Sequence, residues 1–151
     1  MKKNKGGSKR FRQGFFKPIN PKKYLGDPTN IVYRSSWELK VLKQLDLSSK
    51  VLAYGSEEIK IPYISPIDNK YHTYFMDFIV ITKEKKVILI EVKPHSQTIP
   101  PRKTQTKTEQ RLLLETKTYL VNRAKWKATE EYCEKKGWSF LILTEKNINF
   151  T

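Results

Sequence analysis

The stretch Tyr71-His-Thr-Tyr-Phe-Met-Asp-Phe-Ile-Val-Ile81 is followed, after a short polar turn, by Val87-Ile-Leu-Ile-Glu-Val-Lys93. Both segments are rich in the β-branched and aromatic residues of buried strands. Each is interrupted by one carboxylate, Asp77 in the first segment and Glu91 in the second. A buried carboxylate without a partner is destabilising, so the two strands call for either ion pairs or a bound cation.

The connection between these segments predicts how the two carboxylates are placed. It is short and polar and is centred on Glu84, which favours an antiparallel hairpin. A hairpin with this centre puts Asp77 directly opposite Glu91, with their Cβ atoms about 5 Å apart. A turn one residue longer or shorter would put them on opposite faces of the sheet. Lys93 projects to the same side as Glu91, about 7 Å along the strand.

The opposed carboxylates predict a metal site. Two carboxylates at this separation repel each other, and a divalent cation keeps both ionised at neutral pH. Ligation by oxygen alone, with room for water, suits Mg²⁺, for which Mn²⁺ can substitute. Lys93 adds a positive charge that can hold water or stabilise charge that develops on a phosphate. The alternative is a structural ion-pair cluster of Asp77, Glu91 and nearby lysines.

The composition indicates a polyanionic partner. The 151 residues form a single domain by size, and 30 Lys and Arg against 15 Asp and Glu give a net charge of +15. Nucleic acid is the commonest partner of so basic a chain. A membrane is a poor alternative, because the sequence has no long apolar span and no signal-peptide pattern. The lone Cys133 has no second cysteine with which to form an internal disulfide.

The N-terminal residues form a separate segment by composition. Residues 1–23 hold nine Lys and Arg among glycines and prolines, so we expect a flexible basic arm in front of a single domain at residues 24–151. The aromatic residues of the arm either stack on bases or anchor the arm on the domain. A merely solubilising arm is equally compatible with the pattern.

Glu38 has two interpretations. A helix is predicted from Ser35 or Ser36 to Leu45, and Glu38 lies on its apolar face with Leu42. That position makes Glu38 a third acidic residue for the site. The same residues fit a capping box, in which the Glu side chain bonds back to the backbone at the start of the helix.

The rest of the chain predicts a mixed α/β fold in the order α-β-β-β-α-β, with a mixed central sheet flanked by helices. Ile59–Tyr63 precedes the hairpin as an edge strand. Two helices are expected after Lys93. One spans residues 104–119 around three leucines, and one spans residues 122–136, with Asn122 as its cap and Gly137 as its stop signal. A last strand covers residues 138–144.

These residues together resemble the PD-(D/E)XK restriction-endonuclease-like superfamily. Within it, Tyr33-Arg-Ser-Ser-Trp-Glu38, Asp77-Phe, Ile90-Glu-Val-Lys93-Pro and Phe140-Leu-Ile-Leu-Thr-Glu145 are similar to the endonuclease subunit of heteromeric transposases. They are more similar still to the head completion family of tailed bacteriophages. This similarity extends from about Gln13 to Glu145 and includes Asn122 and Lys125-Trp126.

The resemblance implies metal-dependent cleavage of DNA phosphodiester bonds. Asp77, Glu91 and the backbone carbonyl of Val92 would bind Mg²⁺, and Glu38 would complete the acidic cluster directly or through water. Lys93 would position the attacking water. The residues expected to contact DNA are Lys9, Arg10, Arg12, Arg34, Lys103, Lys107, Arg111, Arg123 and Lys125.

The implied biological role is head completion. Packaged DNA ends would be trimmed or modified and the capsid closed before tails join, in the host cytoplasm or with the protein retained in the virion. DNA and the portal or neck proteins of a phage would be the partners. Two alternatives stay open, namely a non-catalytic basic protein that binds DNA ends, and a transposase-like subunit that cuts only with a partner.

Overall fold

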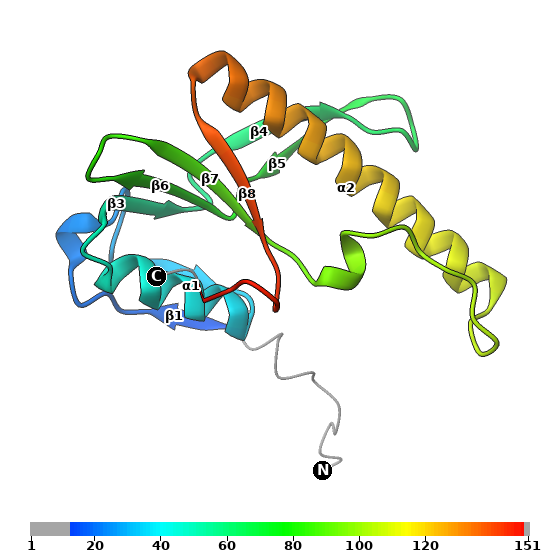
Figure 1. The fold of residues 1–151 in the computed structure, drawn as a ribbon, viewed down its shortest axis with the longest axis horizontal. Coiled ribbons are helices and arrows are strands. Elements are labelled where there is room, and N and C mark those ends of the chain that lie inside the picture. Colours follow the sequence, from blue (N-terminus) through cyan, green and yellow to red (C-terminus); the bar gives the residue numbers. More distant parts are fainter. Residues whose placement is uncertain (1–12, 150–151) are drawn as a thin grey trace, which may run out of the picture.

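The computed structural model describes residues 13–149 and is built around a four-stranded mixed sheet in the order β3-β6-β7-β8 (Figure 1). The strands are β3 (Val51–Ser56), β6 (Phe78–Thr82), β7 (Val87–Val92) and β8 (Ser139–Leu143). Neighbours β3, β6 and β7 are antiparallel, whereas β8 runs parallel to β7. The predicted α/β class is confirmed, with a mixed sheet and two long helices that are consistent with a restriction-endonuclease-like core.

The β6–β7 hairpin has the predicted register. Phe78 pairs with Ile90 and Ile81 pairs with Val87, so the turn is centred on Glu84 and continuation of the register places Asp77 opposite Glu91. Lys85 takes a left-handed conformation with φ 66° to close the turn. A non-glycine residue rarely adopts this conformation. The hairpin therefore forms although the turn lacks the residues that usually signal one.

Residues 71–81 were predicted to form a single strand, but they form two strands. Residues 71–75 form β5, which pairs with β4 (Lys60–Ile64) in a separate two-stranded sheet. The chain then passes through Met76 and Asp77 before β6 begins. Met76 is buried, and its N–H donates to the carbonyl of Ile59 (2.8 Å), which holds the break in place. The edge strand expected at Ile59–Tyr63 is β4, shifted by one residue, and β3 was not predicted.

The first helix, α1 (Ser36–Leu47), begins where the sequence predicts. Ser35 is its N-cap, and the Ser35 Oγ accepts a hydrogen bond from the N–H of Glu38 (3.1 Å). Leu42 and Leu45 are buried against one face of the sheet, in a cluster that includes Val80 and Ile90. Alternate residues of β6 and β7 face the other way, into a second cluster. The sheet thus has a core on each face.

The second long helix, α2 (Glu109–Lys136), replaces the two helices that were predicted. Thr108 caps its start and Gly137, with φ 70°, ends it. Asn122 is not a cap but lies mid-helix and is buried, because the C-terminal half of α2 packs on the second cluster, which includes Cys133. The N-terminal half extends beyond the sheet (Figure 1), so the three predicted core leucines lie largely in solvent, with Leu113 and Leu114 exposed.

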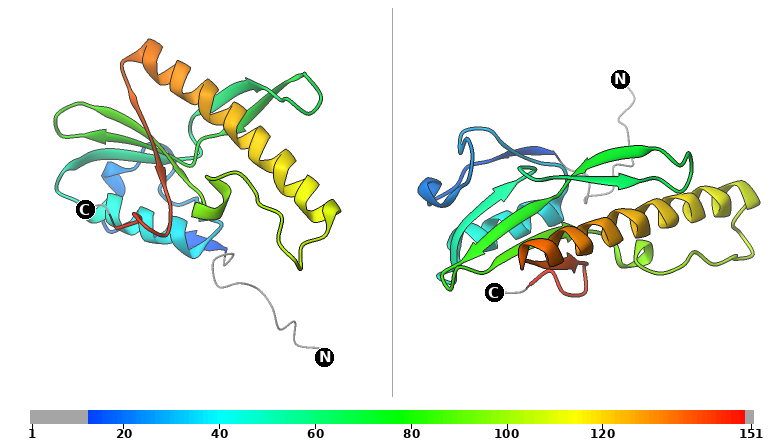
Figure 2. Two further views of the ribbon diagram at one scale, coloured as in Figure 1. Left: turned by 45° about the vertical axis from the view of Figure 1, so that its right-hand side comes forward. Right: turned by 90° about the horizontal axis from the view of Figure 1, so that it is seen from above.

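The β4–β5 hairpin runs alongside α2, as the view from above shows (Figure 2, right). The hydroxyl of Tyr74 on β5 donates to the carbonyl of Lys125 on α2 (3.2 Å) and also contacts the hydroxyl of Thr129. In the sequence, β4 and β5 come between two strands of the central sheet. They form a sheet of their own, which is bonded to α2. A short 3-10 helix, η3 (His95–Gln97), follows β7.

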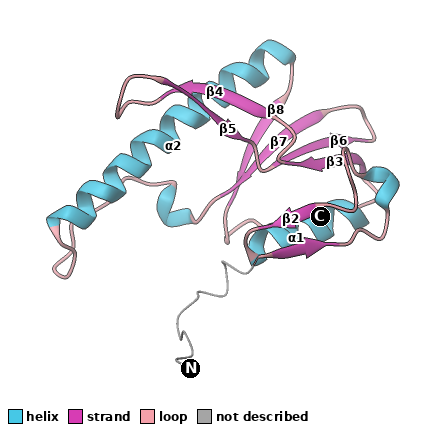
Figure 3. Cartoon of the chain, turned by 180° about the vertical axis from the view of Figure 1, so that it is seen from behind, coloured by secondary structure: helices cyan, strands magenta, loops and turns pink. Residues whose placement is uncertain are grey.

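Part of the predicted arm belongs to the ordered domain. Residues 14–16 form β1, which pairs with β2 (Ile31–Tyr33) beside α1 (Figure 3), and residues 21–23 form the 3-10 helix η2. The buried carboxylate of Asp46 accepts hydrogen bonds from the N–H groups of Ile19 (2.9 Å) and Asn20 (3.2 Å). The described domain therefore begins before residue 24. Residues 1–12 of the predicted arm lie outside the described residues.

The end of α1 is fastened by Lys23. Its Nζ donates to the carbonyls of Leu45, Asp46 and Ser48 at 2.8–2.9 Å, which satisfies backbone acceptors that the helix leaves open. Within residues 13–149, neither α1 nor α2 is long and apolar enough to cross a membrane.

Substitution of Asp46 should destabilise the whole domain. The Asp46→Ala variant leaves the backbone N–H groups of Ile19 and Asn20 and the buried hydroxyl of Tyr54 without their acceptor. We expect the free energy of unfolding to fall by about 3 kcal/mol. Urea denaturation followed by tryptophan fluorescence measures the loss. Tyr54→Phe removes only one of these bonds and should cost about 1 kcal/mol. Equal losses in the two variants would contradict the role of Asp46 in holding residues 19 and 20.

Candidate active site

Asp77 lies between the end of β5 and the start of β6, and its side chain is turned toward β7. Its Oδ2 accepts a hydrogen bond from the backbone N–H of Val92 (2.8 Å). Within an extended strand the N–H and C=O of one residue point to the same side. The carbonyl of Val92, a predicted metal ligand, therefore faces the same edge as Asp77.

The surroundings of Asp77 disfavour its ionised form. Burial, followed by the charge of Glu91, raises the pKa of Asp77 to about 7. Glu38 raises this pKa further, while the Val92 N–H and the charge of Lys93 oppose the shift. Negative charge at this point is thus only partly compensated by the protein itself.

Glu91 and Lys93 form an ion pair at the end of β7. The distance from Lys93 Nζ to Glu91 Oε1 is 3.2 Å, and the Glu91 side chain is buried. The N–H of Lys93 donates to the carbonyl of Leu143 on β8 (2.9 Å), which fixes where the lysine leaves the sheet. The alternative of an ion-pair cluster is therefore partly realised. One lysine compensates one carboxylate, however, and the second carboxylate remains.

Trp126 is a site residue that sequence reasoning did not assign to the site. Its indole Nε1–H, from α2, donates to Glu91 Oε2. Glu91 is therefore held by Lys93 at one oxygen and by Trp126 at the other. The signal in the sequence was a tryptophan on a largely polar helix, where its N–H needs an acceptor once the ring is buried.

Glu38 acts at the start of α1. Its Oε2 accepts from the backbone N–H of Arg34 (2.9 Å), one residue before the position that a standard capping box uses. Burial raises the pKa of Glu38, and the N–H of Arg34 opposes the shift. The charge of Glu38 also reaches Asp77, as the pKa of Asp77 shows. The cap is thus observed, while the predicted role of Glu38 at the metal stays a prediction.

The donor set fits a hard divalent cation in part. Asp77 and Glu91 supply two opposed carboxylates and Val92 a carbonyl, which is the oxygen chemistry that Mg²⁺ prefers. The raised pKa of Asp77 marks a position where added positive charge is favourable. In the part of the chain that the structure describes, no group of three or more His, Cys, Asp or Glu side chains is arranged to hold a metal. The predicted role of Glu38 at the metal, directly or through water, is therefore untested by this arrangement.

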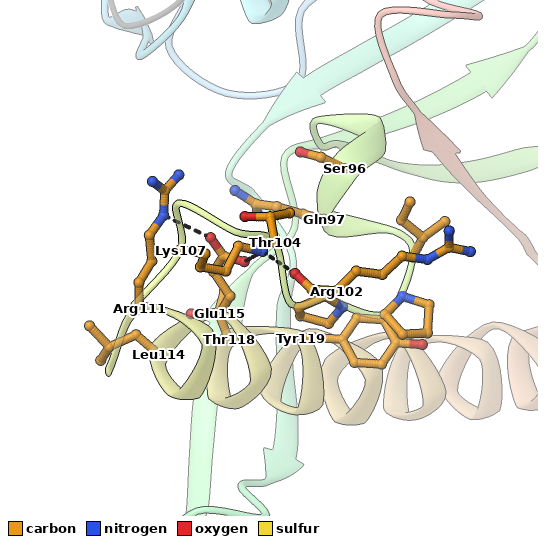
Figure 4. Close-up of a pocket in the computed structure, with 13 residues that line it drawn as sticks. Ser96, Gln97, Arg102, Thr104, Lys107, Arg111, Leu114, Glu115, Thr118 and Tyr119 are labelled. Carbon is orange, nitrogen blue, oxygen red and sulfur yellow. Dashed lines mark hydrogen bonds and ion pairs between the residues drawn. The ribbon is translucent and has the colours of Figure 1, made fainter. Parts of the chain in front are cut away.

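The predicted DNA-contacting residues lie in several places. Arg34 pairs with Glu57 (Nε–Oε1 3.0 Å), and Lys107 and Arg111 both pair with Glu115 beside a pocket at the start of α2 (Figure 4). Lys103 Nζ donates to the carbonyl of Lys107, Arg123 is exposed, and Lys125 is half-buried. Lys9, Arg10 and Arg12 lie outside the described residues.

Fold and site define an α/β protein with a restriction-endonuclease-like core, in which an acidic pair and a lysine meet at the end of the central hairpin. Residues 48–145 match the family model described as TnsA-like endonuclease N terminal, and the chain belongs to this family. The chain is also 39% identical over 138 residues to the head completion nuclease of Enterobacteria phage T4, across 89% of this chain and 92% of that protein. The resemblance predicted from the sequence is confirmed in both parts.

Without metal, Asp77→Asn should stabilise the protein at neutral and alkaline pH. The carboxyl of an unfolded Asp titrates near pH 3.9, whereas the folded carboxyl keeps its proton to about pH 7. The free energy of unfolding therefore falls as the pH rises from about 4 to about 7 and stays lowered above that. Asn cannot ionise, and its Oδ1 can still accept from Val92. We expect the melting temperature in EDTA near pH 8 to rise by about 5 °C or more.

The same comparison near pH 4 should show little difference, because Asp77 is then protonated in the folded wild type. Glu84→Gln removes an exposed carboxylate in the turn of the hairpin. This variant should have the wild-type melting temperature at both pH values. A wild type as stable as the Asp77→Asn variant near pH 8 would count against a buried, uncompensated Asp77.

Proposed function

We propose that the protein is a metal-dependent DNA endonuclease that acts in phage head completion. The observation that carries this proposal is the buried Asp77 opposite Glu91, with Lys93 at Glu91 and too little positive charge for both carboxylates. Membership of the endonuclease family and the identity to a head completion nuclease support it. The net charge of +15 suits a DNA substrate.

The metal would be Mg²⁺, with Mn²⁺ able to replace it, in a site of the PD-(D/E)XK type. Asp77, Glu91 and the carbonyl of Val92 would hold it, and Glu38 would complete the site directly or through water. When bound, the cation neutralises phosphate charge and makes water a better nucleophile.

The protein's own groups orient the reaction. Hydrolysis forms a bond from a water oxygen to phosphorus and breaks one P–O bond to deoxyribose, while the water loses a proton and the leaving oxygen gains one. Lys93 would donate a hydrogen bond to the attacking water and hold it beside the phosphate. Trp126 keeps Glu91 Oε2 in one orientation, so the carboxylate does not turn away when Lys93 engages water.

The basic residues outside the site would hold the polyanion. Arg34 lies just before α1 and pairs with Glu57. Lys103, Lys107, Arg111, Arg123 and Lys125 lie on α2 or on the loop that precedes it. Contacts to phosphate fix position without reading sequence, so little base preference is expected. Lys9, Arg10 and Arg12 of the basic arm would add to the same binding.

In the infected host, such an activity would trim or modify packaged DNA ends before the tail is attached. DNA and the portal or neck proteins would be the partners, and the work would take place in the host cytoplasm, with the protein retained in the virion as a further option. The alternatives are a non-catalytic protein that binds DNA ends and a transposase-like subunit that requires a partner.

Substitution at the acidic pair and at the lysine tests catalysis. Asp77→Ala and Lys93→Met should lower Mg²⁺-dependent nicking of plasmid DNA by at least about 100-fold, since the first removes a proposed metal ligand and the second the proposed donor to the attacking water. Gel assays of supercoiled plasmid measure the rate. Mg²⁺ or Mn²⁺ should also raise the melting temperature of the wild type but not that of Asp77→Ala.

The same assay separates the alternatives. A wild type that binds DNA but never nicks it, and does not respond to either metal, supports the non-catalytic protein. Nicking that begins only when a partner protein is added supports the transposase-like subunit.

Glu38→Gln separates the two roles of Glu38. A Gln side chain can still accept from the N–H of Arg34, so the helix cap survives and the free energy of unfolding should change by less than about 1 kcal/mol. If Glu38 also orders water at the metal, nicking should slow by about tenfold or more. Urea denaturation and plasmid nicking give the two readouts. A folded Glu38→Gln variant that nicks DNA at the wild-type rate would leave Glu38 with the cap alone.

A further inference from the structure

Lys125 occupies a defined place in the structure and not the open surface where the sequence puts it. Its Nζ lies 5.6 Å from the ring centroid of Tyr63 and 5.2 Å from that of Tyr74. The two rings stand edge to face at 5.7 Å and come from β4 and β5. A lysine ammonium over aromatic rings is attracted to their faces. The β4–β5 hairpin thus holds the lysine of α2 in one position.

The backbone around Lys125 is fixed from both sides. The carbonyl of Lys125 accepts from the Tyr74 hydroxyl, and the next residue, Trp126, donates to Glu91. Tyr74 lies three residues before Asp77 in the chain, so the segment that carries the lysine is tied to both members of the acidic pair.

The ammonium of Lys125 has no carboxylate partner of its own among the described residues. No carboxylate within residues 13–149 lies within 4.0 Å of its Nζ, whereas Lys93 is paired with Glu91. Burial, followed by the charge of Lys93, lowers the pKa of Lys125, while the charges of Glu91 and Asp77 raise it.

The site's charges leave room for a second cation at the phosphate. Asp77, Glu91 and Glu38 bring up to three negative charges to the site, and Lys93 pairs with one of them. A divalent cation would offset the other two, so the two negative charges that a phosphodiester reaches in its transition state when hydroxide attacks would still lack partners. Lys125 is a further ammonium on which the charges of Asp77 and Glu91 act, and it would offset one of them. In a site with little water, such a deficit is costly.

We propose that Lys125 is a second catalytic lysine, whose Nζ donates a hydrogen bond to a non-bridging oxygen of the scissile DNA phosphate. The inference rests on the proposed function, because it needs a phosphodiester at the acidic pair. Lys93 then serves the attacking water and Lys125 the phosphate that receives it.

A matched control exists on the same helix. Lys136 also stacks on two rings, at 5.2 Å from Tyr132 and 5.1 Å from Trp138, but it lies at the C-terminal end of α2. Lys125→Met and Lys136→Met therefore remove the same charge and the same kind of ring contact. Single-turnover nicking of plasmid DNA, measured over a range of protein concentrations, separates the plateau rate from the half-saturating concentration.

We expect Lys125→Met to lower the plateau rate by about 100-fold and to change the half-saturating concentration little, because the contact strengthens in the transition state. Lys136→Met should match the wild type in both. Lys125→Arg keeps the charge and should recover part of the rate. Melting temperatures show whether each variant is folded. If Lys125→Met does not fold, the test is whether the plateau rate of Lys125→Arg is lower than that of the wild type.

Other outcomes overturn the inference. A Lys125→Met variant with the wild-type plateau, or with only a raised half-saturating concentration, makes Lys125 an ordinary phosphate contact or none. Equal losses in the Lys125 and Lys136 variants would show a general effect of charge or stability. A wild type that fails to nick DNA in the presence of either Mg²⁺ or Mn²⁺ overturns the proposed function, and the role of Lys125 with it.

Discussion

The hydrogen bond from the Val92 N–H to Asp77 Oδ2 is the constraint on which the site depends. It forms between the end of β5 and the start of β6, so β7 is paired there by a side chain and not by a strand backbone. The Asp77 side chain accepts from the N–H of Val92, which lies beyond the last backbone pair of the β6–β7 hairpin. The same bond holds the Asp77 carboxylate close to Glu91. Because the register of β6 and β7 places these residues opposite each other, a change of one residue in the turn would undo both the pairing and the site.

The departure of β5 has a second consequence. A continuous strand through residues 71–81 would have kept Tyr74 within the central sheet. With the break at Met76, β5 joins β4 and carries Tyr74 to α2, where its hydroxyl meets the backbone of Lys125. The break at Met76 and Asp77 thus separates β6, which leads from the carboxylate pair into the central sheet, from β5, which contacts α2. The helix in turn reaches Glu91 through Trp126.

The sequence was sufficient for features that depend on local rules. Parity across the turn gave the opposition of Asp77 and Glu91, and the cap at Ser35 and the glycine at position 137 gave helix ends. It failed where distant contacts decide. Residues 71–81 look like one strand in the sequence. The break at Met76 could not be predicted, because it depends on a hydrogen bond to Ile59, which is distant in the sequence. Asn122 looks like a cap, but packing of the C-terminal half of α2, through Cys133, on a cluster that includes Leu89 favours a continuous helix. Lys125 looked like a surface residue, because nothing local reveals that two tyrosines from a separate hairpin surround it.

The site is also a place where the fold works against its own stability. Burial and a facing carboxylate disfavour the ionised form of Asp77, and the indole of Trp126 and the ammonium of Lys93 both serve Glu91 instead. A protein selected for stability alone would place a neutral side chain at position 77. The Nδ2 of Asn122, one turn before Trp126 on α2, is likewise buried without a hydrogen-bond partner among the described residues. Such costs persist when the surrounding core supplies enough stability to carry them, as the clusters on both faces of this sheet do. Asp77 is therefore the position where the proposed cation would supply the missing positive charge.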